Sequence, residues 1–340
     1  MAAPPLRMGI AGLGRMGRRH ATHLAQRVLD AELVAACSPV AEELAWARDA
    51  LGVAHGYTDY AQLLAHPGLD AVFLVTPTTL HADEIVGALD AGKHVFSEKP
   101  LALDLADCLR VEEQAARYPR QKVMIGYVRR FDPSYRDAYD KIQAGAIGRP
   151  FLARSQTADQ NDASGFFVRY AAASGGILLD MSVHDIDTVR WLLGANGAKR
   201  VFATGTIAVH EGLRDCGDVD NAVATIEFVD GQIACIYASR TMAHGHDTMT
   251  EIVGTAGRIT VGQNPRLNRV EIADDHGVRN ECTPTFYERF AEAFRNEAQA
   301  FVDMVRGDAP PPLTLADATE ATRIGIAVTE SLRTGKLVEL

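Results

Sequence analysis

A lysine at the end of an apolar run is the first candidate for chemistry. Lys99 closes the segment AGKHVFSEKP and is followed by Pro100. An X–Pro bond can be cis at modest cost, and a cis bond would turn the lysine toward the edge of a sheet. An ammonium group there would stabilise negative charge that develops on a substrate oxygen. The alternative interpretation is an ordinary surface lysine at the end of a strand.

Three further titratable residues fall on an otherwise apolar stretch. Asp180, His184 and Asp187 have spacings of four and three residues, which would place them on one face of a helix. Such groups are costly on a mostly buried helix unless they are paired or used. A histidine has its pKa near working pH, so His184 could accept a hydroxyl proton, which Asp180 would tune or relay. The alternative is a structural Asp–His hydrogen bond.

A glycine-rich turn indicates a dinucleotide site. Gly12, Gly14 and Gly17 form GxGxxG directly after a strand-like run and at the start of a helical pattern, with Arg15 and Met16 inside the motif. The first glycine permits a tight turn, the second lets the backbone approach a pyrophosphate, and the third lets the helix pack on the strand. The diphosphate would then lie at the helix N-terminus.

The expected ribose-binding acid is missing. An NAD site usually has an acid about twenty residues after the glycine turn, at the end of the second strand. Ser38 stands there instead, and no arginine or lysine follows at once. Arg15 and Arg48 are the cations that could reach a 2′-phosphate, although Arg48 fits better as a solvated helix residue. We therefore expect NAD, with NADP possible.

Residues 1–125 alternate strand-like and helical patterns, which predicts a Rossmann domain with a doubly wound parallel sheet. The expected strands are 7–12, 32–38, 71–76, 94–98 and 122–126.

Residues 126–340 read differently and predict an α+β domain for substrate binding and oligomerisation. Long strand-like runs between 200 and 283, with a hairpin signal at 229–232, predict a large, open, mostly antiparallel sheet. A polar loop is expected at 158–165. Helices are expected at 132–145, 177–193, 286–307 and 315–335.

Composition narrows the class of protein. The chain has 340 residues, enough for two domains, and a net charge of −10, which argues against nucleic-acid or membrane partners. Its five cysteines are scattered without a CxxC pair, so we expect no metal site and a cytoplasmic location. No signal-peptide core or membrane-length apolar run is seen.

The motifs together resemble the glucose–fructose oxidoreductase / inositol dehydrogenase / rhizopine-catabolism (Gfo/Idh/MocA) family over nearly the whole chain. They include GLGRMG, AGKHVFSEKP, GYVRRFDPSY and SGGILLDMSVHDID, and the last two look closest to inositol 2-dehydrogenases. The resemblance implies catalysis by Lys99, Asp180 and His184 and a homo-oligomer, a dimer or tetramer. It also implies cofactor contacts by Thr76, Pro77, His81, Glu98 and Lys99, and substrate contacts by Lys99, Arg129, Asp180, His184 and Asp187.

The resemblance leaves the substrate open. His244 stands where inositol dehydrogenases often carry tyrosine, and Asn161 in the polar loop could add hydroxyl contacts. We expect oxidation of a cyclic polyol or sugar, with myo- or scyllo-inositol as the leading class. The alternatives are an aldose dehydrogenase acting at the anomeric carbon, an NADPH-dependent keto-sugar reductase, which Ser38 would favour, a cofactor-retaining glycosidase, and a non-catalytic sugar-sensing regulator.

Overall fold

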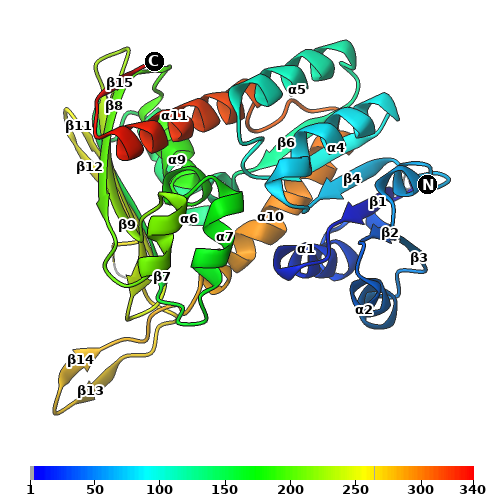
Figure 1. The fold of residues 1–340 in the computed structure, drawn as a ribbon, viewed down its shortest axis with the longest axis horizontal. Helices are drawn as coiled ribbons and strands as arrows, with labels where there is room; N and C mark the ends of the chain where they lie inside the picture. The colour runs from blue at the N-terminus through cyan, green and yellow to red at the C-terminus, as the bar shows by residue number, and fades with distance from the viewer. Residues whose placement is uncertain (1–3, 264) are drawn as a thin grey trace. The chain divides into compact units, whose positions relative to one another are not determined.

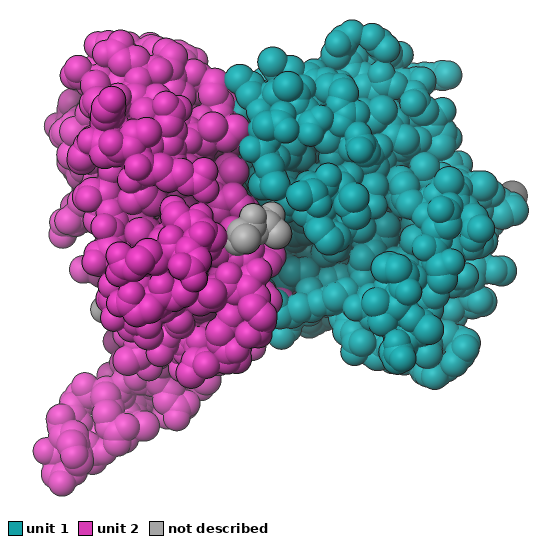
Figure 2. Space-filling model, in the orientation of Figure 1, with its two compact units in different colours: residues 1–128, 292–319 teal, residues 129–291, 320–340 magenta. Residues whose placement is uncertain are grey.

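The computed structural model describes residues 4–263 and 265–340, which form two compact units (Figure 2). Unit 1 contains residues up to Val128 together with Glu292–Thr319, and unit 2 contains Arg129–Ala291 with Glu320–Leu340. The predicted domains, 1–125 and 126–340, are each continuous in sequence. Unit 1 instead includes a C-terminal segment that the prediction placed in the second domain. The division into 1–125 and 126–340 as independently folding domains stays a prediction.

Unit 1 contains a parallel sheet of six strands in the order β3-β2-β1-β4-β5-β6 (Figure 1). This order reverses direction between β1 and β4, as in doubly wound dinucleotide-binding folds, so the predicted Rossmann fold is confirmed. Its strands are β1 (Leu6–Ala11), β2 (Ala31–Cys37), β3 (His55–Tyr57), β4 (Ala71–Leu74), β5 (His94–Glu98) and β6 (Val123–Gly126). Its helices are α1 (Arg15–Gln26), α2 (Ala41–Leu51), α3 (Tyr60–Leu64), α4 (Thr78–Asp90) and α5 (Leu105–Arg117).

A C-terminal helix completes the core of unit 1. Helix α10 (Phe286–Arg306) carries Phe301, whose ring meets those of Phe73 and Phe96 edge-on at 6.2 and 6.0 Å. Phe73 and Phe96 lie on the adjacent strands β4 and β5 and stack at 3.8 Å. These three rings are fully buried, and this apolar cluster explains why the segment after Glu292 belongs to the first unit.

Unit 2 is built on a seven-stranded mixed sheet in the order β12-β11-β7-β10-β9-β8-β15. Only the β7–β10 pair is parallel among the ladders of this described sheet, so the mostly antiparallel prediction is confirmed. Its strands are β7 (Pro150–Gln160), β8 (Ala198–Thr206), β9 (Asn221–Phe228), β10 (Ile233–Met242), β11 (Asp247–Gly254), β12 (Gly257–Val261) and β15 (Val338–Glu339), with a separate hairpin of β13 (Ile272–Asp274) and β14 (Gly277–Arg279). The predicted hairpin at 229–232 joins β9 to β10.

Helices cover one face of this sheet. Strand β9 alternates buried and exposed residues, and α9 packs against β7 and β11, so the opposite face is left to solvent in this structure. The helical elements are η1 (Val128–Phe131), α6 (Pro133–Gln143), α7 (Phe166–Ser174), α8 (Ile177–Asp180), α9 (Val183–Leu193), η2 (Glu211–Cys216) and α11 (Leu315–Thr334), which continues from unit 1. No described helix is long and apolar enough to cross a membrane.

Three sequence predictions differ from this fold. The polar loop predicted at 158–165 is strand up to Gln160, because β7 pairs there with both β10 and β11. Helix α7, in the run FFVRYAAAS, was not predicted. The single helix predicted at 177–193 is two helices separated at Met181–Ser182, where the amide of Ser182 donates to Ile177 five residues back. This widened turn changes which side chains share a face.

Candidate functional site

The glycine turn of unit 1 has room only for a bare backbone at two positions and open space at a third. Gly12 has φ of +88°, and a Cβ there would lie 2.4 Å from the carbonyl oxygen of Val75. A Cβ on Gly17 would lie 2.0 Å from the Gly12 oxygen. Nothing lies within 4 Å of the Cβ position of Gly14, so a ligand can approach the backbone closely. The turn thus packs against the chain on one side and opens on the other.

Helix α1 begins directly after this turn. Its N-cap is Gly14, which offers no side chain to the first amides, and Arg15 and Met16 are its first two residues. No acidic residue stands in its first turn. The amides of this first turn and the positive end of the helix dipole suit a pyrophosphate, so the residues present fit a bound dinucleotide.

Ser38 lies at the end of β2 but is not free to donate to a ribose. Its side chain is buried, and its Oγ donates to the Glu43 carboxylate at 2.5 Å while accepting from the amide of Val40 at 3.1 Å. A hydroxyl has one hydrogen, so Ser38 cannot donate to a ribose hydroxyl while it donates to Glu43. Only its remaining lone pair could serve a ligand.

The loop after β4 is tied to the loop after β5 by a buried histidine. Thr76 donates to Glu84 at 2.5 Å, and Pro77 caps helix α4. The two ring nitrogens of His81 lie 3.0 Å from the Thr76 carbonyl oxygen and 2.9 Å from that of Pro100. Burial lowers the pKa of His81, and a neutral imidazole can donate to only one of these oxygens. His81 therefore links the predicted cofactor loop at Thr76 to the segment at Pro100.

Lys99 follows β5, and the Lys99–Pro100 bond is cis, one of the two geometries that the sequence analysis left open. The backbone amide of Lys99 donates to Glu98 at 3.1 Å. The other oxygen of Glu98 lies 2.7 Å from Nε2 of His20. Burial opposes the charge of Glu98, but the hydrogen bond from His20 and the charges of His20 and Lys99 hold its pKa below the usual value. Glu98 thus fixes the backbone that carries the lysine.

A second carboxyl lies close to this pair. Glu297 of α10 is fully buried, and neither of its oxygens has a hydrogen-bond partner among the residues that the structure describes. Burial and then the charge of Glu98 raise the pKa of Glu297 well above the usual value. The side-chain atoms of His20, Glu98 and Glu297 that could bind a metal ion lie within 4.8 Å of one another. His20 and Glu98, however, already contact each other at the length of a hydrogen bond.

Unit 2 presents Asp180 and His184 as partly exposed residues of two largely buried helices. Asp180 ends α8 with its side chain 17% exposed, and His184 is the second residue of α9. Nη2 of Arg240 donates to Asp180 at 3.2 Å, and Nη1 of Arg240 lies 3.7 Å from Asp218. Arg240 is 1% exposed, so Asp180 is held by a buried cation that the sequence analysis did not single out.

Asp187 and Arg129, two further predicted substrate contacts, are both buried in ion pairs. Both oxygens of Asp187 accept from Arg130, with contacts from 2.6 to 3.2 Å, and its side chain is 1% exposed. Asp187 lies three residues after His184 in α9, whereas Asp180 belongs to α8. Arg129 is also buried, where it donates to Asp185 at 2.7 Å and to Thr157. These pairs join η1 to α9 and β7 inside unit 2.

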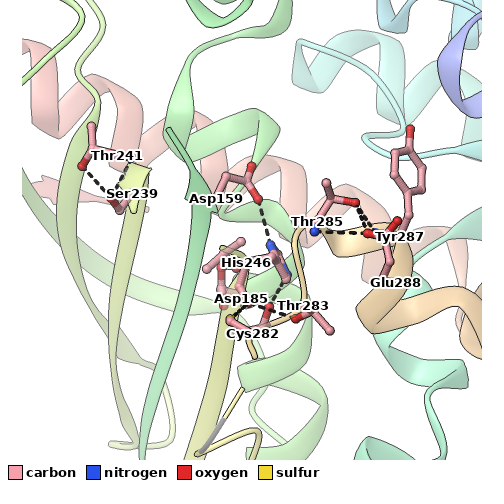
Figure 3. A network of polar contacts seen from close by, with 12 residues as sticks. Asp159, Asp185, Ser239, Thr241, His246, Cys282, Thr283, Thr285, Tyr287 and Glu288 are labelled. Atoms are coloured by element: carbon pink, nitrogen blue, oxygen red, sulfur yellow. Dashed lines mark hydrogen bonds and ion pairs between the residues drawn. The ribbon is translucent and has the colours of Figure 1, made fainter. Parts of the chain in front are cut away.

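The two histidines between β10 and β11 have different surroundings. His244, the predicted substrate contact, is 49% exposed and lies 3.5 Å from Asp247. His246, which was not predicted, is buried, and Figure 3 shows its ring beside Asp159. The other ring nitrogen of His246 contacts the hydroxyl of Thr248. The carboxylate of Asp159 can only accept, so Nδ1 of His246 carries the proton at 2.9 Å.

Asn161 lies just beyond β7 with its side chain exposed, and its backbone amide donates to the carbonyl of Met242. The only sequence feature that points to His246 is its spacing of two residues from His244. Alternation places neighbouring residues on opposite sides of an extended segment, but it does not say which side is inside.

A doubly wound sheet, a glycine turn at its switch point and an open helix N-terminus define a nicotinamide-dinucleotide oxidoreductase. Residues 6–127 match the family model for the NAD-binding Rossmann fold of an oxidoreductase family, GFO_IDH_MocA, and residues 140–340 match the C-terminal alpha/beta domain of the same family. The chain belongs to the Gfo/Idh/MocA oxidoreductase family. The resemblance seen in the sequence is thereby confirmed.

Relatives of this family are similar over almost the whole chain. A scyllo-inositol 2-dehydrogenase (NAD(+)) of Bacillus subtilis is 38% identical over 98% of this chain and 96% of its own. A myo-inositol 2-dehydrogenase of Thermotoga maritima is 34% identical over 98% of both chains. The crystal structure of scyllo-inositol dehydrogenase from Lactobacillus casei with bound NAD(H) and scyllo-inositol has a TM-score of 0.95 and 37% identity, covering 98% of this chain and 99% of that one.

Proposed function

We propose that this protein oxidises a ring hydroxyl of myo- or scyllo-inositol to the inosose, with NAD as the hydride acceptor. The full-length similarity to NAD-dependent scyllo-inositol 2-dehydrogenase carries the proposal. The glycine turn, with its open approach at Gly14, supports dinucleotide use. When bound, NAD would supply the site that receives the hydride.

Three side chains have the chemistry that the oxidation requires. His184 would accept the proton of the substrate hydroxyl, because imidazole is the side chain best suited to take up a proton at working pH. Asp180, held by Arg240, would orient His184 and receive or return that proton. Lys99 would stabilise the developing alkoxide, and the hydrogen bond between its amide and Glu98 would keep its backbone in place.

The remaining predicted substrate contacts divide by exposure. Asn161 and His244 have exposed side chains that could meet a polyol, and we keep them as substrate contacts. Asp187 and Arg129 are buried in ion pairs, which favours a positioning role for both. A site built to bond hydroxyls discriminates strongly against ligands that lack one.

The test is steady-state formation of reduced cofactor with myo- and scyllo-inositol. Lys99→Ala should lower turnover by about a hundredfold or more while leaving the dissociation constant of NAD within about twofold. Lys141→Ala, which removes an exposed lysine of α6, is the matched control and should behave like the parent. Turnover of neither inositol would contradict the substrate, and an active Lys99→Ala variant would contradict the role of the lysine.

We propose further that the protein is a cytoplasmic homo-oligomer. Five cysteines without disulfide pairing in the described chain support a reducing compartment. The exposed face of the unit 2 sheet supports self-association, because it presents apolar side chains in adjacent strands. They are Phe202, Val223, Ile233 and, beside β15, Leu337, each at least 40% exposed.

A further inference from the structure

A carboxylate stands close to the expected ribose position, although it does not come from β2. The amide of Gly12 donates to the carbonyl of Cys37 at 2.9 Å, which places the end of β2 beside the glycine turn. Ser38 follows Cys37, and its hydroxyl donates to Oε2 of Glu43 at 2.5 Å. Glu43 belongs to the first turn of α2. Its carboxylate therefore lies one hydrogen bond from the residue that would otherwise carry the acid.

We propose that Glu43, held by Ser38, is the residue that selects NAD over NADP, an inference that rests on the proposed use of a nicotinamide dinucleotide. Glu43 makes no other side-chain hydrogen bond in the described part of the chain, so its second oxygen can accept from a ribose hydroxyl. A hydrogen bond to an ionised acceptor is stronger than one to a neutral hydroxyl. Ser38 thus holds the carboxylate of Glu43 in place of an acid of its own.

The same charge works against a 2′-phosphate. A phosphate at the ribose would lie next to the carboxylate of Glu43, and like charges at short range repel. The nearby cations do not cancel this carboxylate. Arg48 lies in the last turn of α2 and is paired with Asp49 at the surface. Arg18 lies over the ring of Trp46 at 5.0 Å, one turn after Glu43. Neutralising Glu43 would leave the guanidinium of Arg18, which belongs to α1, over Trp46 of this helix.

A purely structural role for the pair predicts a different result. Glu43 is the third residue of α2, and the helix has no side-chain cap at Val40. The contact between Ser38 and Glu43 could then do no more than fix the start of the helix. A glutamine at residue 43 keeps the acceptor for Ser38 and removes only the charge. Glu43→Gln therefore separates charge from shape.

The experiment measures dissociation constants of NAD and NADP by calorimetry for the whole protein, without any polyol. Glu43→Gln should lower the preference for NAD over NADP by about tenfold or more. Glu42→Gln removes a neighbouring exposed charge of the same helix and should leave the preference unchanged. Ser38→Ala keeps the charge but releases the carboxylate, and should lower the preference by a smaller factor.

The outcomes are distinct. An unchanged preference in Glu43→Gln, an equal change in Glu42→Gln, or a parent protein that prefers NADP would each overturn the inference. Because binding is read without substrate, a parent that prefers NAD but oxidises no inositol would contradict the proposed reaction and leave the role of Glu43 standing.

Discussion

The residue with the most demanding surroundings in unit 2 is Arg240. It is 1% exposed, contacts Asp180 and Asp218, and its guanidinium lies 5.1 Å from the ring centre of Phe167. Asp218 in turn accepts from the amide of Ile177 at 3.0 Å, where α8 begins. One buried cation therefore holds both ends of α8, the helix that carries Asp180. Removing it would leave two carboxylates without their counter-charge.

Arg240→Met should lower the free energy of unfolding by roughly 3 kcal/mol or more, because an uncompensated buried charge is costly. Urea unfolding of the parent and the variant measures this difference. Arg200→Met is the control, since Arg200 is an exposed arginine of the same sheet paired with Glu227, and such a pair contributes about 1 kcal/mol or less. Equal losses in the two variants would contradict the role given to Arg240.

At the residue scale, the sequence predicts types of chemistry better than partners. Lys99 could be singled out because it follows a strand and precedes a proline. Arg240 could not, because its partners Asp180 and Asp218 are sixty and twenty-two residues away and meet it only through the pairing of β10. Glu43 was missed for a related reason. The rule used for the ribose acid looks at the end of a strand, whereas this carboxylate comes from the next helix.

At the scale of an element, helix α10 places a titratable side chain in an apolar core. It brings Glu297 into the core of unit 1, near Glu98 and His20. An ideal Cβ on Gly126 would lie 3.4 Å from Glu98 and 3.5 Å from Glu297, so the carboxyls approach β6 where it ends. Burial and the charge of Glu98 raise the pKa of Glu297. The folded protein therefore holds a proton that the unfolded chain releases at lower pH.

Stability should consequently fall as pH rises above the ordinary pKa of a glutamic acid. The folded state binds one more proton than the unfolded state in that window, and the window ends at the raised pKa of Glu297. Glu297→Gln keeps a neutral group of the same shape and should show a smaller fall in stability as pH rises above about 5. Melting temperatures across that range measure it.

The control for this prediction is Glu292→Gln, on the exposed side of the same helix, which should retain the slope of the parent. A parallel shift of the whole curve in Glu297→Gln, with the slope intact, would mean that Glu297 does not hold the proton.

Element boundaries mark where sequence reasoning was strong and where it failed. Five strands of the first sheet were predicted within two residues, because buried parallel strands read as short apolar runs, whereas the short and largely exposed β3 was not predicted. The run 177–193 has one continuous apolar pattern, yet it forms α8 and α9. Nothing in the side-chain pattern reveals a hydrogen bond from the amide of Ser182 to Ile177, so the break that separates Asp180 from the helix of His184 and Asp187 was not predicted.

At the scale of the whole molecule, the compact units do not follow the order of the chain. The sequence predicts two classes of domain correctly but cannot tell that Glu292–Thr319 joins the first unit, because helix periodicity does not name the surface that a helix covers. The chain passes from unit 2 to unit 1 just after Phe290, where φ of −114° and ψ of 18° interrupt α10. Helix α11 makes the return.

The proposed self-association is also a property of the whole molecule, and it can be tested on the sheet of unit 2. Phe202 and Ile233 are exposed on β8 and β10, where copies would meet. The double variant Phe202→Glu with Ile233→Glu would bury two unpaired charges per copy in such an interface, which is strongly unfavourable. Light scattering should give the parent a multiple of 36.7 kDa and the variant a smaller mass.

Cys235 provides an independent readout on the same face. It is exposed in the single chain, and its register partner Thr225 on β9 is also paired with Phe202. Because an assembled interface would cover Cys235, brief alkylation should modify it slowly in the parent and fast in the double variant. Leu29→Glu, at an exposed position of unit 1, should change neither the mass nor the alkylation rate. A parent that is monomeric and rapidly alkylated at Cys235 would show that this face stays open to solvent.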